Sequence, residues 1–189
     1  MKTDGSTPSG NSIESQQSSC GPASRIAHSK IVMKEQLLRM VAVWRAQHRK
    51  VVFTNGCFDV LHAGHVSLIE QAAALGDVLV VAVNSDASVR HAKGEGRPVN
   101  DQNHRTLALA GLPATDAVVA FNEDTPVELL EMVRPDVLVK GEEYSREQVV
   151  GGAFVESYGG QIVRTEMVEG ISTTGIIGRM KPQADAPGH

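Results

Sequence analysis

Several features that define common classes of protein are absent from this 189-residue chain or rare in it. Its two cysteines, Cys20 and Cys57, are too few for a disulfide scaffold, and a chain of this length can bury a core without one. The longest uninterrupted apolar run covers only Val78 to Val83, whereas a bilayer-spanning helix needs about 20 such residues. The N-terminal part also lacks the apolar stretch of about 7 to 15 residues that marks a secretory signal. We therefore expect a cytoplasmic protein without a membrane span.

An excess of basic residues is also missing. The chain has 18 Lys and Arg against 22 Asp and Glu, which gives a formal net charge of −4. Proteins that coat nucleic acid usually carry a strong basic excess, so nucleic acid is not an expected partner. Phosphate binding by this chain must therefore depend on a few placed cations and on backbone N–H groups.

The most familiar nucleotide-binding signatures are missing as well. A Walker loop requires a Gly-Lys dipeptide, and none occurs in the sequence. Gly94, Gly96 and their neighbours do not form the G-x-G-x-x-G pattern that follows a strand in dinucleotide-binding proteins. These absences disfavour both a kinase and an enzyme that transfers hydride.

Composition divides the chain into three parts. Residues 1–29 are rich in serine and contain no Phe, Trp, Tyr, Leu or Val, so they offer little apolar area to offset the entropy lost on ordering. We predict a disordered leader there, a single folded domain over 30–181, and a disordered tail over 182–189.

Within the predicted domain, helical and strand patterns alternate. Apolar residues at helical spacing predict helices over 31–48, 63–75, 85–91, 102–111, 126–133, 146–158 and 173–180. Short apolar or β-branched runs predict strands over 50–54, 77–83, 117–121, 137–140 and 161–165. Gly76 is expected to end the second of these helices. The alternation predicts an α/β fold with a doubly wound parallel sheet, of the Rossmann-like kind.

Polar clusters follow the predicted strands at their ends. They lie at Thr54–His65, Asn84–Asp86, Lys140–Tyr144 and Ile171–Thr174. Doubly wound sheets bind ligands beyond the carboxyl ends of their strands, where the winding direction reverses. We therefore expect these clusters to form one site.

The segment T-N-G-C-F-D-V-L-H-A-G-H over 54–65 runs from the first strand into a helix. His62 and His65 are three residues apart and are expected to share a face near the helix N-terminus, which attracts phosphate. Gly64 leaves the space between the imidazoles open, and Gly56 is expected to let the backbone turn at the strand end. Two imidazole donors above backbone amides suit a phosphorus centre that gains negative charge.

Other interpretations of this segment carry less weight. Zinc binding by Cys57, His62 and His65 would use a spacing that is unfamiliar in structural zinc sites. Phe58 is expected to act mainly as a packing anchor, and Asp59 is expected to organise the turn or the helix start.

Four stretches together resemble the H-x-G-H nucleotidyltransferases. They are the segment over 54–65, then K-G-E-G-R-P-V-N over 93–100, L-V-K-G over 138–141 and I-S-T-T over 171–174. More narrowly, residues 30–181 resemble the adenylyltransferase domain that acts on D-glycero-β-D-manno-heptose 1-phosphate. That domain is fused behind a sugar kinase in some organisms, and the present sequence is expected to be the stand-alone form.

The resemblance implies transfer of AMP from ATP to a sugar 1-phosphate, with release of pyrophosphate and no covalent enzyme intermediate. It assigns catalysis to His62, His65 and Lys93. It assigns nucleotide binding to Thr54, Asn55, Gly56, Phe58, Gly64, His65, Lys140, Ser172, Thr173 and Thr174. It assigns substrate binding to Arg97, Arg105 and Asn84.

Several of these residues have a second possible role. Lys93 and Arg97 flank two glycines and belong either to a phosphate-closing loop or to an ordinary surface loop. Arg105 either binds the acceptor or pairs with a carboxylate. Ser172, Thr173 and Thr174 can cap the last helix while also binding phosphate. Asn84 and Asp86 suit a ligand contact or a helix cap.

Family members often have Gly-Asp after the Lys-Gly pair, where this chain has Glu142-Glu143. An Asp-specific contact is therefore not expected at that place. The resemblance further implies Mg²⁺ bound with the triphosphate, no identifiable protein metal ligands, and assembly as a homo-oligomer, most simply a dimer.

Two alternative functions stay open at this point. The first keeps the chemistry but changes the substrates, as in a glycerol-3-phosphate cytidylyltransferase or a GTP-using heptose enzyme. The second is a nucleotide-binding regulatory module without turnover, against which the paired imidazoles argue.

Overall fold

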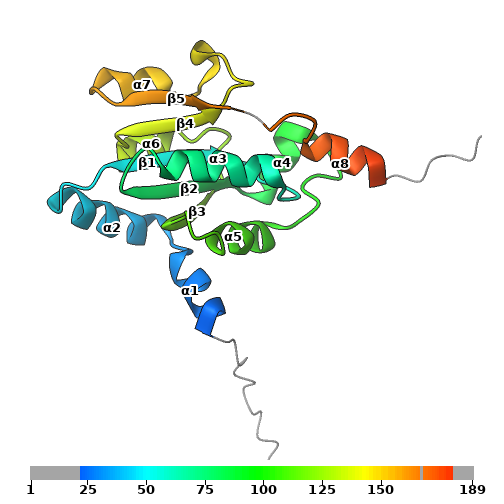
Figure 1. Ribbon diagram of the computed structural model, residues 1–189, viewed down its shortest axis with the longest axis horizontal. Helices are drawn as coiled ribbons and strands as arrows, with labels where there is room; N and C mark the ends of the chain where they lie inside the picture. Colours follow the sequence, from blue (N-terminus) through cyan, green and yellow to red (C-terminus); the bar gives the residue numbers. More distant parts are fainter. Residues whose placement is uncertain (1–21, 167, 181–189) are drawn as a thin grey trace, which may run out of the picture.

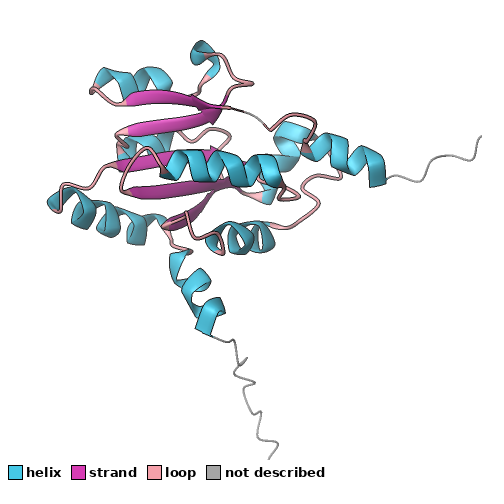
Figure 2. Ribbon diagram, viewed as in Figure 1, coloured by secondary structure: helices cyan, strands magenta, loops and turns pink. Residues whose placement is uncertain are grey.

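The computed structural model describes residues 22–166 and 168–180. Its helices are α1 (Pro22–Lys30), α2 (Lys34–Ala46), α3 (Ala63–Ala73), α4 (Asp86–Lys93), α5 (Gln102–Ala110), α6 (Val127–Val133), the 3₁₀ turn η1 (Arg146–Gln148), α7 (Gly152–Ser157) and α8 (Thr173–Met180). Its strands are β1 (Val51–Gly56), β2 (Val78–Asn84), β3 (Ala117–Phe121), β4 (Val137–Gly141) and β5 (Gln161–Thr165). Figure 1 labels them, and Figure 2 separates helices from strands by colour.

The five strands form one parallel sheet in the order β3-β2-β1-β4-β5. The chain winds from β1 outward through β2 to β3, then returns to the other side of β1 to add β4 and β5. This reversal is the topological switch of a doubly wound fold, so the predicted fold class is confirmed. The switch lies between the neighbouring strands β1 and β4.

Helices cover both faces of the sheet, which explains why the central strands are almost continuously apolar. On one face, α2, α6 and α7 contribute Leu37, Leu130 and Val155 to a core that includes Phe53 of β1. On the other face, α1, α3 and α5 pack against the alternate side chains of the same strands. The outer edge of β3 is covered where the Val32 N–H donates to the Val118 carbonyl at 2.9 Å.

Two predicted helices differ clearly from the structure. The predicted helix over 146–158 is broken into η1 and α7, because Gly151 adopts a left-handed φ of 82°. A side chain at this position would collide with Leu130, so the residue there is glycine. Helix α3 ends at Ala73, before Gly76. A Cβ at Gly76 would lie 2.6 Å from the Val52 side chain, so glycine is needed there for close packing.

The predicted leader over 1–29 also differs from the structure in part. Its last residues, 22–29, belong to α1, and Ala27 of this helix is buried against the sheet-covering helices. The rest of the leader and the predicted tail over 182–189 lie outside the described residues. Across the described ranges, no helix is both long enough and apolar enough to cross a membrane.

Candidate active site

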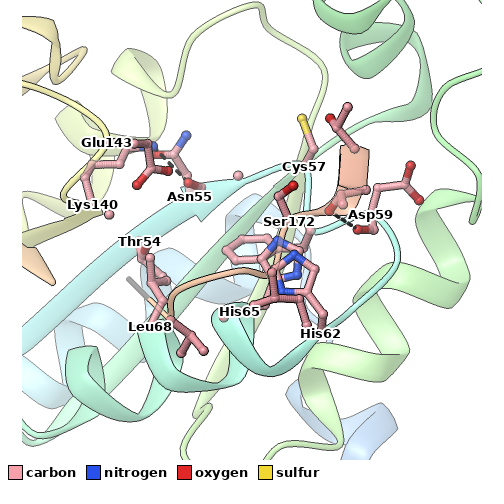
Figure 3. Close-up of a pocket in the computed structure, with 18 of the residues that line it drawn as sticks. Thr54, Asn55, Cys57, Asp59, His62, His65, Leu68, Lys140, Glu143 and Ser172 are labelled. Carbon is pink, nitrogen blue, oxygen red and sulfur yellow. Dashed lines mark hydrogen bonds between the residues drawn. The ribbon is translucent and has the colours of Figure 1, made fainter. Parts of the chain in front are cut away.

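A cleft of about 310 Å³ opens at the carboxyl ends of β1 and β4, at the topological switch. Its walls come from the loop between β1 and α3, the end of α4, the loop after β4 and the segment before α8. The lining residues are Thr54, Asn55, Gly56, Cys57, Phe58, Asp59, His62, Gly64, His65, Leu68, Lys93, Arg97, Lys140, Gly141, Glu143, Tyr144, Val168, Ile171, Ser172, Thr173 and Thr174. All four stretches that resemble the nucleotidyltransferases therefore meet in one place. Figure 3 labels residues from three of them, over 54–65, 138–141 and 171–174.

The two predicted histidines form a stacked pair on one wall of the cleft (Figure 3). His62 is the residue just before the first turn of α3, and His65 lies in that turn, which brings the ring centroids to 3.9 Å with 20° between the planes. The Phe58 ring meets His65 edge-on, with centroids 5.4 Å apart. The sequence spacing of three residues is therefore sufficient to place both imidazoles side by side.

The protonation of the imidazoles follows from their surroundings. Burial lowers the pKa of His65 to about 4, with a further decrease from the neighbouring His62, and burial also lowers the pKa of His62. Both rings are therefore neutral at pH 7. The Nδ1 atoms of both are buried and have no hydrogen-bond partner within the described residues. A neutral imidazole carries one N–H donor and one bare nitrogen, so each ring can offer a single N–H to a ligand.

Two glycines leave room for this arrangement. A Cβ at Gly64 would lie 3.1 Å from two atoms of the His62 ring, so a side chain at this position would crowd the imidazoles, as predicted. Gly56 lies within β1, and a Cβ there would come within 3.4 Å of the Phe58 ring. The sharp turn expected at Gly56 occurs instead at Phe58 and Val60, whose φ angles are 49° and 50°. Positive φ is costly for such side chains, so surrounding contacts must hold this loop.

Asp59 supplies those contacts. Its carboxylate accepts hydrogen bonds from the Arg97 Nε at 2.8 Å and from the backbone N–H groups of Val99 at 2.8 Å and Asn100 at 3.0 Å. Burial raises the pKa of Asp59, but the two N–H groups and the Arg97 guanidinium together hold it below its usual value. Asp59 thus organises the turn, as predicted, and also fixes the loop that carries Arg97.

The segment before α8 forms the opposite side of the cleft. The Ser172 hydroxyl accepts a hydrogen bond from the Gly175 N–H at 3.1 Å, which is the expected N-terminal cap. The Thr173 hydroxyl donates to the Asp59 carbonyl at 2.9 Å. Thr174 also lines the cleft. The N-terminus of α8, with its unpaired N–H groups, is therefore held against the loop that contains the imidazoles.

Two cations approach the cleft from the loop after α4. Lys93 is the exposed last residue of that helix. Gly94 and Gly96 follow with φ angles of 89° and 84°, and Arg97 then turns back toward Asp59. Both cations line the cleft.

Lys140 lies at the other end of the cleft, where β4 ends (Figure 3). Its ammonium donates to the Asn55 carbonyl at 2.8 Å and stands 5.6 Å from the Tyr144 ring centroid. Burial lowers the pKa of Lys140 to about 8, although the Glu143 carboxylate opposes this decrease. Lys140 is therefore a desolvated cation whose charge responds to groups that enter the cleft.

The neighbouring polar groups of β1 have different roles. The Thr54 hydroxyl donates to the Val139 carbonyl at 3.1 Å and so ties β1 to β4, and the residue also lines the cleft. The Asn55 Oδ1 is buried and has no hydrogen-bond partner within the described part of the chain. An unpaired buried oxygen is costly, and a ligand donor can satisfy it.

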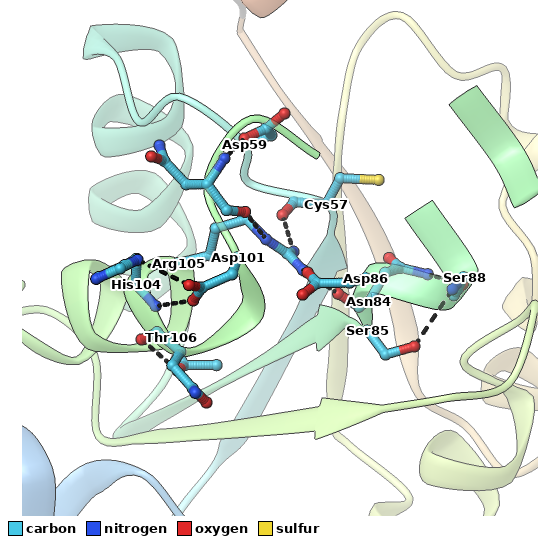
Figure 4. A network of polar contacts seen from close by, with 12 residues as sticks. Cys57, Asp59, Asn84, Ser85, Asp86, Ser88, Asp101, His104, Arg105 and Thr106 are labelled. Atoms are coloured by element: carbon cyan, nitrogen blue, oxygen red, sulfur yellow. Dashed lines mark hydrogen bonds and ion pairs between the residues drawn. The ribbon is translucent and has the colours of Figure 1, made fainter. Parts of the chain in front are cut away.

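Arg105 and Asn84, both predicted to bind substrate, do not line the cleft. The Arg105 side chain is 2% exposed and donates to the carbonyls of Cys57, Asn84 and Asn100 and to the Asp86 carboxylate at 2.7 Å (Figure 4). The Asn84 amide donates to the Ser88 hydroxyl. The prediction that Arg105 and Asn84 bind substrate is therefore wrong. Every nitrogen of the Arg105 guanidinium already has a partner in the protein, and the alternative role of Arg105, pairing with a carboxylate, is the one observed.

The structure adds lining residues to which sequence reasoning gave no individual role. Cys57 and Ile171 lay within the quoted motifs, and Leu68 follows His65 by one helical turn, so spacing could have found these three. Glu143 and Tyr144 reach the cleft because the chain after Gly141 folds back, with the Tyr144 N–H donating to the Gly141 carbonyl. The sequence carries no comparable signal for Val168.

Fold and cleft together define a doubly wound α/β protein with a cleft at its topological switch that is lined by two imidazoles, several cations and the start of α8. A sequence model described as cytidylyltransferase-like matches residues 53–179, and the chain belongs to that family.

Several curated relatives share the name Bifunctional protein HldE. The one from Koribacter versatilis is 52% identical over 152 residues, and the one from Pseudomonas aeruginosa is 56% identical over 147 residues. These matches cover 80% and 78% of this chain and 31% of each relative. The chain thus spans about a third of the length of these relatives.

Solved structures agree on the fold. A lipopolysaccharide core biosynthesis protein from Thermoplasma volcanium superposes with a TM-score of 0.53 at 24% identity, covering 64% of this chain and 97% of the other. A pantoate-beta-alanine ligase from Francisella tularensis gives a TM-score of 0.51 at 16% identity, covering 72% and 66%. At these identities the likeness concerns the architecture alone.

Proposed function

We propose that the chain is an adenylyltransferase that transfers AMP from ATP to D-glycero-β-D-manno-heptose 1-phosphate and releases pyrophosphate. The observation that carries this proposal is the stacked pair of neutral imidazoles in the cleft at the topological switch. Two adjacent N–H donors beside a helix N-terminus suit a phosphorus centre whose oxygens gain charge. The choice of ATP and the heptose phosphate rests on the resemblance of residues 30–181 to that group of adenylyltransferases, and the extensive identity to the HldE proteins supports it.

In the proposed reaction, an oxygen of the acceptor phosphate attacks the α-phosphorus of ATP in line. The bond from that phosphorus to the β-phosphate breaks, and pyrophosphate leaves with the electron pair. The acceptor is already an anion, so the step needs no general base and no protein nucleophile. Catalysis then consists of positioning and charge stabilisation.

The residues of the cleft divide this work. His62 and His65 each donate a ring N–H to oxygens of the α- and β-phosphates. The N-terminus of α8, with Ser172 and Thr174, receives the rest of the triphosphate. Lys93 and Arg97 approach from the loop after α4 and offset the charge of the leaving pyrophosphate. Asn55 and Lys140 face the parts of the substrates beyond the reacting phosphates.

A divalent ion such as Mg²⁺ would accompany the triphosphate. No cluster of three or more His, Cys, Asp or Glu suited to a metal occurs among residues 22–166 and 168–180. This donor set fits an ion that is held mainly by phosphate oxygens and water, which is common for Mg²⁺. Glu143 is the lining carboxylate that could add a ligand, because Asp59 is committed to Arg97. When bound, the ion would neutralise phosphate charge.

The experiment that tests the proposal measures pyrophosphate release with ATP, CTP or GTP, each paired with the heptose 1-phosphate or with glycerol 3-phosphate. We expect the fastest release with ATP and the heptose 1-phosphate. Preference for CTP and glycerol 3-phosphate would replace the proposal by the glycerol-3-phosphate cytidylyltransferase alternative. Nucleotide binding without release from any pair would identify a regulatory module and overturn the proposed function.

We also propose that the enzyme works in the cytoplasm as a homodimer, as the resemblance implies. Light scattering coupled to size-exclusion chromatography tests the assembly, and we expect twice the chain mass of 20.2 kDa. Elution at the mass of a single chain would contradict the proposed dimer.

A further inference from the structure

Asp59 occupies an unusual position, because it connects the two sides of the cleft and yet is closed off from solvent. Its side chain is 1% exposed. The carboxylate holds the loop that carries Arg97, while the backbone carbonyl of the same residue accepts the hydroxyl of Thr173 at the start of α8. One residue, placed three positions before His62, therefore contacts both phosphate-facing elements that lie outside its own loop.

The backbone around Asp59 is held in a conformation that local preferences oppose. Phe58 and Val60, directly before and after it, have φ angles of 49° and 50°. Valine is β-branched and rarely adopts positive φ. Such a conformation persists only where surrounding contacts over-determine it, and residues of this kind gather at functional sites. The strained turn directs the Asp59 carboxylate to one neighbour and its carbonyl to the other.

The way Asp59 holds Arg97 is also informative. The contact is from Nε alone, at 2.8 Å, and the Arg97 side chain is 18% exposed where it lines the cleft. An Nε contact fixes the plane of the guanidinium and leaves both terminal NH₂ groups available. Those two groups form the fork that binds phosphate oxygens in a bidentate manner. A carboxylate whose only role was to neutralise the charge of Arg97 could equally have accepted hydrogen bonds from its two terminal NH₂ groups.

We propose that Asp59 is a positioning residue for the nucleotide phosphates: its carboxylate orients the Arg97 guanidinium and its carbonyl anchors the N-terminus of α8 through Thr173. The role rests on the proposed function, since it concerns the same cleft. Asp59 does not touch the phosphates. Through its two contacts, Asp59 sets the distance between the Arg97 guanidinium and the N-terminus of α8, the two groups that face the phosphates across the imidazoles.

The first test is a double-mutant cycle read by ATP binding in isothermal titration calorimetry. We expect Asp59→Asn and Arg97→Gln each to weaken ATP binding about tenfold, since each removes the oriented guanidinium. Adding Asp59→Asn to Arg97→Gln should weaken binding by less than about threefold more. Equal losses in both backgrounds, or no loss from Asp59→Asn alone, would overturn the proposal.

The second test addresses the carbonyl of Asp59 without changing its side chain. Thr173→Val removes the hydroxyl donor and should weaken ATP binding several-fold, whereas Thr173→Ser restores most of that affinity. ATP binding by Thr173→Val equal to that of the wild type would overturn this part. The test remains decisive even where Asp59→Asn fails to fold.

Asp101→Asn is the matched control. Asp101 is an exposed carboxylate that caps α5 through the His104 N–H, and asparagine caps equally well. We expect unchanged ATP binding and an unchanged melting temperature. Because binding is measured without an acceptor sugar, a wild-type protein that binds ATP but releases no pyrophosphate would refute the proposed function while still testing the role of Asp59.

Discussion

Arg105 and the imidazole pair both belong to the carboxyl edge of the sheet, and they differ in how completely the protein satisfies their polar atoms. Arg105 donates four hydrogen bonds and has an ion pair with Asp86, so its charge is fully matched by the protein. The imidazoles of His62 and His65 are stacked on each other, and their buried Nδ1 atoms have no partner within the described residues. Polar groups that the protein completes are structural, and those it leaves incomplete are available to a ligand. The predictions below test this distinction.

The largest expected effect comes from the incomplete group. His65→Ala should lower the turnover number for pyrophosphate release by about 10²–10³-fold, because one donor to the reacting phosphates is lost. The melting temperature should change little, since no hydrogen bond of the folded protein is broken. His104→Ala, at an exposed position on α5, is the control and should keep full activity. Near-normal turnover in His65→Ala would remove that residue from the mechanism.

The complete group should behave in the opposite way. Arg105→Met leaves three carbonyls and the Asp86 carboxylate without their donor, and we expect the free energy of unfolding to fall by about 3 kcal/mol. Urea unfolding followed by circular dichroism measures this loss. A stable Arg105→Met protein that has lost only its affinity for the acceptor would restore the substrate-binding role that the structure denies.

A smaller effect is expected when the imidazoles are displaced without being removed. Gly64→Ala places a Cβ 3.1 Å from the His62 ring, which must then shift by a few tenths of an ångström. We expect about a tenfold loss in turnover, because catalysis depends on the position of the donors. Gly178→Ala is the matched control, since a Cβ there meets nothing within 4 Å. Equal activities of the two variants would show that the ring position is not critical.

The smallest effect concerns stability and pH. The pKa of folded His65 is about 4, below the ordinary 6.5, so the unfolded chain binds the proton more readily between these values. Stability should therefore fall as the pH falls from 6.5 to 4 and should not depend on this group above 6.5. Melting temperatures at pH 7 and 4.5 should differ less in His65→Ala than in the wild type. An identical difference in both proteins would contradict the burial of this imidazole.

Much of the fold could be predicted because local signals agreed with the final structure. Three elements begin and end where predicted: the strands over 117–121 and 161–165 and the helix over 173–180. The strands are short apolar or β-branched runs, and small capping residues mark the start of the helix. The pairing of His62 with His65 depends on a local signal, the start of α3 directly after His62. Gly151 is different, because its effect on the predicted helix over 146–158 depends on the contact with Leu130 from a distant segment.

The role of a site residue could be predicted where one stretch of sequence contained the whole pattern. It could not be predicted where the role depends on contacts between several distant segments. Arg105 lies on an amphipathic helix, where a charged residue is ordinarily exposed. Its burial arises because the sheet brings the carbonyls of Cys57, Asn84 and Asn100 to one point. The approach of Glu143 to the cleft likewise depends on the path of the chain after β4. Sequence spacing contains no information about such meetings.

The most direct test of the account is an imidazole ¹⁵N NMR spectrum recorded during titration with ATP. We predict that the ring nitrogens of His62 and His65 shift together as ATP binds, while those of the exposed His91 and His104 stay unchanged. Saturation of the protein with ATP while both cleft rings keep their free-state signals would show that the phosphates bind elsewhere and would contradict the account.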